Sequence, residues 1–282
     1  SNNMQPVFVD VSPTTYNIDP AQIEKHITPK TRAILPVHLM GLPCDMDPIL
    51  QIAKKHKLKI LEDCCESMFA SYQGKKVGSL GDVGAFSTYV AHYLVTGVGG
   101  LTTAKDPELA NHIRSLMNHG RDTAYLSIDD DDNLSDKELE QTVRARFRFV
   151  HFGYSSRCTE LEAALGLAQI DEKEKIIEAR RAVAHRYNEG LRTLATHLQC
   201  PTETDHAPHM YMLYPLVLKK GSKWKLVHYL EKHGIETREL MPLLSQPAFQ
   251  KKFGNLEKQY PVAQWINASR LLYRMSSAPH TE

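Results

Sequence analysis

Two stretches of the chain decide its fold: LKILEDCCES at residues 58–67 and VGAFSTYVAHYL at residues 83–94. Each begins with an apolar run as long as a buried strand, and polar side chains follow where that run ends. Amphipathic helical patterns lie between such runs, at residues 47–56 and 107–117. Apolar strands that alternate with helices indicate an α/β fold, with a mostly parallel sheet covered by helices on both faces.

The same patterns predict the other elements. Strands are expected at residues 6–11, 32–39, 100–104, 210–218 and 235–238, and helices at residues 20–27, 159–196, 223–233 and 261–273. The long helical region should bend near Lys173, and the acidic, polar residues 126–140 should form a solvated loop. After Pro201 the pattern becomes that of a smaller α+β unit. We therefore expect a large domain at residues 1–172 and a small domain at residues 173–282.

The composition excludes several classes of protein. The chain has 282 residues, of which 42% are hydrophobic and 24% charged, and a net charge of +1, so neither nucleic acid nor a membrane surface is an expected partner. No apolar run reaches the ~20 residues of a membrane span. Five cysteines without a C-x-x-C pair favour buried thiols and a reducing cytoplasm. The histidines show no metal-site spacing, so no metal is expected.

Asp63 and His92 are the side chains that suggest a site. Asp63 follows one predicted strand directly, and His92 comes just past the next. Ligands of open parallel sheets bind beyond the carboxyl ends of the strands, so the two side chains could face one pocket. Ser87, which lies between them, could donate a hydrogen bond to a phosphate. Taken singly, a strand-end aspartate is more often a cap, and a lone histidine is more often a satisfied core group.

Several blocks occur together and in order along nearly the whole chain. They are PVFVDV at 6–11, YNIDP at 16–20, AILPVHLMG at 33–41, EDCCES at 62–67, RSLMNHGR at 114–121, GYSSRCTELEAALGLAQ at 153–169 and IETR at 235–238. In this combination the chain resembles the DegT/DnrJ/StrS family, fold-type I pyridoxal phosphate enzymes that act on nucleotide-linked keto sugars in deoxysugar and polysaccharide biosynthesis.

The resemblance implies a role for each site residue. Asp63 would pair with the pyridine nitrogen of the cofactor, and Glu66 would lie near the phenolic oxygen of the ring. Ser87 would contact the phosphate. His92 stands at the position of the Schiff-base lysine. Ser155 stands where relatives carry an asparagine that reaches the phosphate of the partner subunit, and the shorter serine leaves that contact open.

The histidine changes the chemistry that the resemblance implies. An imidazole cannot form a Schiff base, so pyridoxal or pyridoxamine 5'-phosphate would be held non-covalently. The family's sugar 3-dehydratase branch also has a histidine in place of the Schiff-base lysine. In that branch the histidine takes a proton from the cofactor, and the 3-hydroxyl of a 4-keto-6-deoxy sugar leaves. Ala91 before the histidine resembles that branch, whereas Val90 and Tyr93 differ from the proline and second histidine expected there. A sugar aminotransferase with an amino donor such as glutamate, and a non-catalytic binding or assembly protein, stay open as alternatives.

Three further residues each have two possible roles. Tyr93 could line the sugar pocket or pack in the core, His209 could contact substrate or pack at a strand end, and Arg238 could contact substrate or form a surface salt bridge. Relatives dimerise through the block at residues 153–169, so we expect a homodimer. Compared with the family, the sequence appears as a fragment without the first block of the large domain and without the last helix. We therefore expect an exposed apolar sheet surface.

Overall fold

The computed structural model describes residues 4–122, 133–239 and 243–274, and the side chains of these residues up to Ser269. The predicted sheet of the first half is present, in the order β1 (Ala33–Ile34), β2 (Lys59–Asp63), β5 (Val83–Ser87) and β6 (Gly100–Ala104). β1, β2 and β5 are parallel, whereas β6 runs antiparallel to β5. Because Asp63 is in register with Ala85, the carboxyl ends of β2 and β5 meet at one edge of this sheet.

The two faces of this sheet differ in burial. Ile60 and Glu62 of β2 point to a buried face, on the side of helix α1 (Met46–His56). Leu61 alternates with them and is 38% exposed, and Leu35, next to β1, is 57% exposed. Residues of a strand alternate between faces, so the opposite face of the sheet carries apolar side chains open to solvent. This confirms the exposed apolar surface expected from the sequence, although the α/β pattern alone predicted a sheet covered on both faces.

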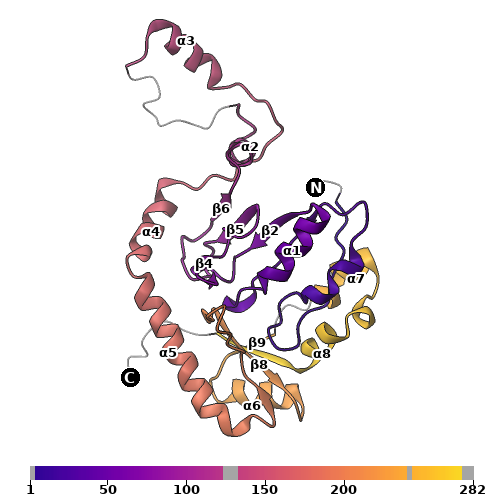
Figure 1. The fold of residues 1–282 in the computed structure, drawn as a ribbon. Coiled ribbons are helices and arrows are strands. Elements are labelled where there is room, and N and C mark those ends of the chain that lie inside the picture. The colour runs from indigo at the N-terminus through magenta and orange to yellow at the C-terminus, as the bar shows by residue number, and fades with distance from the viewer. Residues whose placement is uncertain (1–3, 123–132, 240–242, 275–282) are drawn as a thin grey trace.

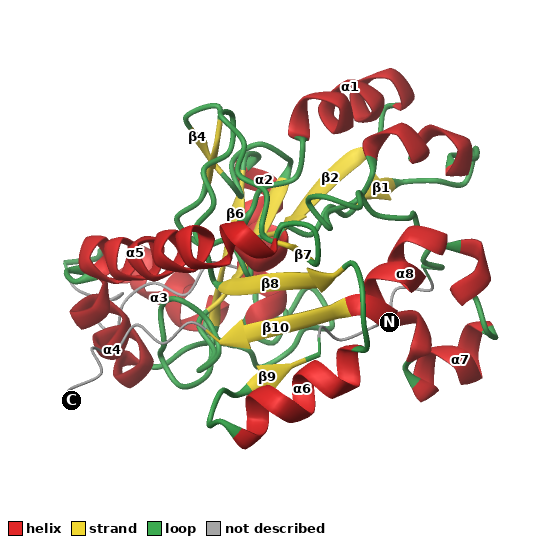
Figure 2. Cartoon of the chain, turned by 90° about the horizontal axis from the view of Figure 1, so that it is seen from below, coloured by secondary structure: helices red, strands yellow, loops and turns green. Residues whose placement is uncertain are grey.

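A second sheet is built from the later part of the chain, in the order β7 (Leu198–Gln199), β8 (Leu213–Leu218), β10 (Arg270–Arg274) and β9 (Thr237–Arg238). All its pairs are antiparallel. Helices α4 (Glu160–Ile170) and α5 (Lys173–Leu191) run along one side of the molecule, from beside the first sheet to beside the second (Figure 1). Helix α6 (Lys223–Lys232) packs on the second sheet (Figure 2). The two sheets lie on either side of residue 172 in the sequence, and the division into two domains at that residue stays a prediction.

Some elements follow the sequence closely. α2 spans Pro107–Met117 as predicted, because the Asp106 side chain accepts from the Glu108 amide and Pro107 takes the first turn. The long helical region breaks into α4 and α5 just before Lys173, also as predicted. None of the described helices is long and apolar enough to cross a membrane.

Other predictions were wrong. The region 261–273 is helical only in α8 (Pro261–Ser269), after which the chain turns into β10, because pairing with β8 and β9 outweighs the local helical pattern. Part of the predicted loop 126–140 is helical instead: α3 (Asp136–Ala145) begins with a capping box of Ser135 and Glu138 and extends away from the sheets (Figure 1). Residues 126–132 lie outside the described part.

Several short elements also differ from expectation. Residues 6–11 contain only an isolated bridge from Val11 to Ile18, and the helix expected at 20–27 is two 3₁₀ turns, with Asp19 as the N-cap of the first. The strand at 32–39 is divided into β1 and an isolated parallel bridge between Val37 and Asp63, because Pro36 between them has no amide to donate to the ladder. The hairpin of β3 (Ser71–Tyr72) and β4 (Lys75–Lys76) and the helix α7 (Pro247–Phe253) were not predicted.

The N-terminal segment is tied to the C-terminal helices. The Asp10 carboxylate is 2% exposed and accepts from the backbone amides of Val262 and Ala263 in α8, at 3.0 and 2.9 Å, and from that of Val11 at 2.9 Å. Phe8 packs against the aromatic rings of α7 and of Tyr260. Figure 1 shows this early segment beside α7 and α8. Asp10 therefore acts as a cap for a helix at the far end of the chain.

Replacing Asp10 by alanine should lower the free energy of unfolding by about 2–4 kcal/mol, since buried amides lose their acceptor. Urea denaturation measures this loss. Asp171→Ala, at an exposed position after α4, is the matched control and should change the free energy of unfolding by less than about 0.5 kcal/mol. Equal effects of the two substitutions would contradict the capping role.

Candidate active site

Asp63 ends β2 and is fixed by its backbone. Its amide donates to the Pro36 carbonyl at 2.9 Å, and its own carbonyl accepts from the His38 amide at 3.0 Å. The half-buried side chain points away from the core, and Oδ1 accepts from the Cys65 amide at 3.1 Å. The carboxylate is thus held at the carboxyl end of the strand, as the sequence predicted.

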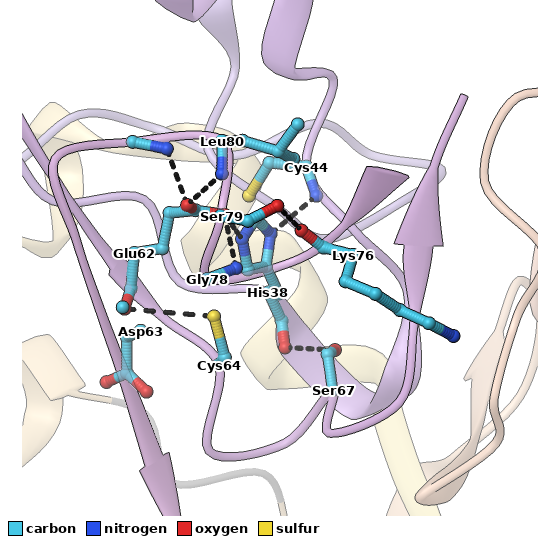
Figure 3. Close-up of polar contacts among 12 residues, drawn as sticks. His38, Cys44, Glu62, Asp63, Cys64, Ser67, Lys76, Gly78, Ser79 and Leu80 are labelled. Carbon is cyan, nitrogen blue, oxygen red and sulfur yellow. Dashed lines mark hydrogen bonds and ion pairs between the residues drawn. The ribbon is translucent and has the colours of Figure 1, made fainter. Parts of the chain in front are cut away.

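Glu62, one residue earlier, points to the opposite side of the strand and is 1% exposed. Its carboxylate accepts from His38 Nε2 at 3.1 Å and from the amides of Gly78, Leu80 and Gly81 at 2.8, 2.8 and 2.6 Å (Figure 3). Burial alone would raise the pKa of Glu62, but the hydrogen bonds from His38, Gly81 and Gly78 outweigh it, so the pKa lies below its ordinary value. Glu62 is therefore a buried carboxylate with a full set of donors.

His38 completes this network. Its Nδ1 accepts from the Cys44 amide at 2.9 Å, so the ring proton is on Nε2 and is donated to Glu62. Ligand atoms of His38, Glu62 and Cys64 lie within 4.8 Å of one another. However, both nitrogens of His38 are engaged, and burial raises the pKa of the Cys64 thiol, which opposes the thiolate form that metals bind. The cluster is a hydrogen-bond network that fixes the end of β2, and its side chains are not available as ligands for a cation.

His92 lies just past the end of β5, beside Asp63. Burial lowers the pKa of its imidazole, whereas the Cys65 carbonyl and the Asp63 carboxylate act on it in the opposite direction. The ring is half-buried, and among the described residues its buried Nδ1 finds no hydrogen-bond partner. The structure thus brings Asp63 and His92 together at the edge where β2 and β5 end. A neutral imidazole held there can accept a proton near neutral pH.

Ser87 and Glu66 border the same edge. Ser87 is the last residue of β5, and its hydroxyl oxygen accepts from the Tyr89 amide at 3.2 Å, which leaves the hydroxyl proton to donate. Glu66 accepts from the Met40 amide at 2.7 Å and so holds the loop after β2 against residues 39–41.

The other predicted residues lie in different settings. Ser155 is exposed and forms a bridge with Asn118 ahead of α4, and no described contact joins it to Asp63. His209 is 4% exposed and stacks on the Tyr211 ring, with centroids 4.1 Å apart, and burial lowers its pKa to about 3. Arg238 is exposed and paired with Glu236. In this structure His209 packs in the core and Arg238 forms a surface salt bridge, as one of the two alternatives for each residue predicted.

Tyr93 is a core residue in this structure. It is 3% exposed, and the guanidinium carbon of Arg180 lies 4.9 Å from the centre of its ring. Arg180 was missed by sequence reasoning, because an arginine within a charged helix gives no local signal of burial. Gln169 at the end of the block 153–169 contacts the backbone of Val95 from α4, a role that the sequence did not indicate.

An α/β fold with a carboxylate and an imidazole at the carboxyl ends of neighbouring strands is an arrangement found in enzymes that bind a ligand at the edge of a parallel sheet. Residues 1–281 match the DegT/DnrJ/EryC1/StrS aminotransferase family, and the chain belongs to it. The match bears out the resemblance seen in the sequence.

The relatives of this chain include proteins named for different reactions. The chain is 35% identical to GDP-perosamine synthase of Caulobacter vibrioides, with 86% of the chain and 62% of the relative aligned. It is 34% identical to the dTDP-4-dehydro-2,6-dideoxy-D-glucose 3-dehydratase of Saccharopolyspora spinosa, with 89% of the chain and 56% of the relative aligned. The chain spans between 59% and 66% of the length of the first three relatives.

Solved structures share the fold. An aminotransferase from Psychrobacter cryohalolentis aligns with a TM-score of 0.85 at 27% identity, covering 98% of this chain and 71% of that one. A GDP-4-keto-6-deoxymannose-3-dehydratase with a histidine replaced by asparagine aligns with a TM-score of 0.82 at 26% identity, covering 96% and 70%. The fold is thus the pyridoxal phosphate fold type I expected from the resemblance.

One argument from the sequence is weakened by these structures. A further variant of that dehydratase carries adjacent serine and histidine positions changed to asparagine and lysine, with the serine first. A serine therefore precedes a substituted histidine in that enzyme, so alanine at position 91 does not by itself indicate a dehydratase.

Exchanging Glu62 for glutamine should lower the free energy of unfolding by about 2–4 kcal/mol, because an amide nitrogen would face the donors that now meet the carboxylate. The folded pKa lies below the ordinary 4.5, so the contribution of Glu62 is complete above that pH and is lost as the pH falls through the folded pKa. In urea titrations the gap between wild type and variant should be constant above about pH 5 and shrink below it.

The exposed Glu178→Gln substitution on α5 serves as the control and should leave stability within about 0.5 kcal/mol. If the difference in free energy of unfolding between wild type and Glu62→Gln stays the same down to pH 3, the ionised Glu62 carboxylate is not the source of the stabilisation.

Proposed function

We propose that the protein is a pyridoxal or pyridoxamine 5'-phosphate enzyme that acts on a nucleotide-linked 4-keto-6-deoxy sugar and removes its 3-hydroxyl, with His92 as the base. The observation that carries this is the imidazole of His92 beside Asp63, with its buried Nδ1 unpartnered among the described residues. A neutral imidazole at this position can take a proton but cannot form a Schiff base. Relatives named as 3-dehydratases support the reading.

The residues at the strand ends fit the cofactor. The Asp63 carboxylate, held by the Cys65 amide, is placed to accept from a protonated ring nitrogen. The Ser87 hydroxyl can donate to a phosphate. When bound, pyridoxamine phosphate supplies an electron sink for the carbon that bears its amine. Related solved proteins carry such cofactors, one of them a dehydratase with bound hydrated PLP.

The proton transfer falls to His92. Burial lowers its pKa and keeps the imidazole neutral, and the negative charge of Asp63 stabilises the imidazolium once a proton has been accepted. Asp63 would thereby serve twice: its carboxylate would keep the ring nitrogen of a bound cofactor protonated, and its charge favours proton uptake by His92. Proton transfer by a positioned side chain contributes about 10²–10⁴-fold to rates.

A sugar aminotransferase is the second candidate. GDP-perosamine synthase and a dTDP-3-amino-3,6-dideoxy-α-D-galactopyranose transaminase are relatives at 35% and 34% identity. This reading requires an amino donor such as glutamate and a route for the amine that does not use a lysine at position 92. A non-catalytic binding protein is the third candidate, and retention of the cofactor separates it from both enzymes.

The exposed apolar side chains of residues 147–167 support a homodimer. Phe152 is fully exposed, Phe147 is 75% exposed, and Leu161 on α4 is 77% exposed. Large apolar side chains that are left exposed in this number favour a surface that binds another protein. The block at 153–169 overlaps this surface, and a second copy of the chain would cover it.

The protein, incubated with pyridoxamine phosphate and a nucleotide-linked 4-keto-6-deoxy sugar, should release the 3-hydroxyl as water, and mass spectrometry of the product follows the loss. His92→Asn should lower the rate by about 10²–10⁴-fold, because the base is removed. A product that keeps the 3-hydroxyl and gains an amine in the presence of glutamate would sink the dehydratase proposal in favour of the aminotransferase.

His92→Lys provides the matched variant. A lysine that faces the cofactor should attach pyridoxal phosphate covalently, and borohydride reduction fixes the attachment for peptide mapping. No reducible attachment at position 92 would show that this side chain does not face the cofactor.

Phe152→Asp together with Leu161→Asp should convert the homodimer to monomers in sedimentation, since two buried charges would meet at the interface. Leu194→Asp, at an exposed leucine outside the block, is the control and should leave the dimer intact. A wild-type protein that sediments as a monomer at micromolar concentration would contradict the homodimer.

A further inference from the structure

The loop that carries His92 is closed at its base. Thr96 donates from its amide to the Thr88 carbonyl at 2.9 Å, and the two threonine hydroxyls are 2.6 Å apart in a buried hydrogen bond. Thr96 Oγ1 also lies 2.9 Å from the Val98 carbonyl. His92 is near the middle of this closed loop, so the position of its ring depends on what holds residues 88–96 from outside.

The first outside contact comes from α4. Gln169 Oε1 accepts from the Val95 amide at 2.9 Å, and Gln169 Nε2 donates to the Val95 carbonyl. One carboxamide thus binds both backbone groups of a single residue, which fixes that residue against translation and rotation. Gly166 permits the close approach of the helix, since a Cβ there would lie 3.2 Å from Thr96 Cγ2 and 3.6 Å from Leu94.

The second outside contact comes from α5. Arg180 is 8% exposed, and its Nη1 donates to the carbonyls of Tyr211 and Met212 at 3.3 and 3.1 Å. The guanidinium carbon then lies 4.9 Å from the ring centre of Tyr93, within the range of a cation–π contact. Tyr93 directly follows His92, so the chain just before β8 fixes the neighbour of the proposed base through Arg180.

We propose that Gln169 and Arg180 are positioning residues for His92, which they hold beside Asp63 by fixing Val95 and Tyr93. This rests on the proposed function only in taking His92 as the base. Neither residue touches the reacting groups. A displacement of a catalytic group by about 1 Å can cost on the order of 10²-fold in rate, so loosening either contact should reduce turnover without changing the base itself.

The experiment compares four variants of the full chain, Gln169→Ala, Gln169→Glu, Arg180→Met and Arg180→Lys, with Arg186→Met as the exposed control on α5. The first measurement needs no cofactor or substrate. In protein with nitrogen-15 histidine, the ring nitrogen signals of His92, assigned by their loss in His92→Asn, report the environment of the imidazole. They should shift in Gln169→Ala and Arg180→Met and stay in place in the control, while the signals of buried His38 remain unchanged in all.

The second measurement is turnover with pyridoxamine phosphate and a nucleotide-linked 4-keto-6-deoxy sugar. We expect kcat to fall about 10- to 100-fold in Gln169→Ala and Arg180→Met with KM within twofold. Arg180→Lys should recover part of the loss, because an ammonium group can still face Tyr93. Gln169→Glu keeps the acceptor for the Val95 amide and should also be the milder change at its position.

The outcomes separate the two proposals. Unchanged His92 signals in both Gln169→Ala and Arg180→Met would overturn the positioning role whatever the activity. Shifted signals together with full activity of His92→Asn would support the positioning role and remove His92 as the base. If Arg180→Met does not fold, Arg180→Lys and the two Gln169 variants give the same readings, and unchanged signals in all three would overturn the proposal.

Discussion

The buried carboxylate of Glu62 is the constraint on which the first sheet depends. It sits at the end of β2 with four donors around it, three of them backbone amides from the turn at residues 78–81 and one from His38. An ionised group without such partners would destabilise the fold severely. Its donors thus fix that turn and the segment around His38, and in doing so they determine where β2 ends.

Because successive side chains of a strand point to opposite faces, Asp63 faces the other way from Glu62. Glu62 points inward and Asp63 outward, so the first acid has a structural role and the second is the one proposed to bind the cofactor. The inner one rigidifies the backbone from which the outer one projects. His92 reaches the same place from β5 because parallel neighbouring strands end at one edge. The position of Asp63 is set by local backbone contacts, whereas the loop that carries His92 is contacted by side chains from α4 and α5.

Sequence reasoning succeeded where local rules decide. The apolar runs of β2 and β5, the Asp106 cap of α2 and the meeting of Asp63 with His92 follow from periodicity, capping and parallel pairing. It failed where distant partners decide. The residues of β10 have a helical sequence pattern but form a strand because they pair with β8 and β9. Arg180 could not be found either, because its burial beside Tyr93 depends on how α5 packs and not on its neighbours in the chain.

The link between Asp10 and α8 also has a kinetic side. Val262 and Ala263 lie 252 and 253 positions after Asp10 in the chain. Forming their hydrogen bonds to Asp10 therefore closes a loop that contains nearly every other described element. Loop closure of this length is entropically costly, and non-local contacts slow folding. During synthesis the segment around Phe8 and Asp10 is made before α8, so it finds these partners only when α8 has followed. Until then the Phe8 ring lacks the aromatic partners that cover it in the folded chain, so the earliest described segment is among the last to reach its native contacts.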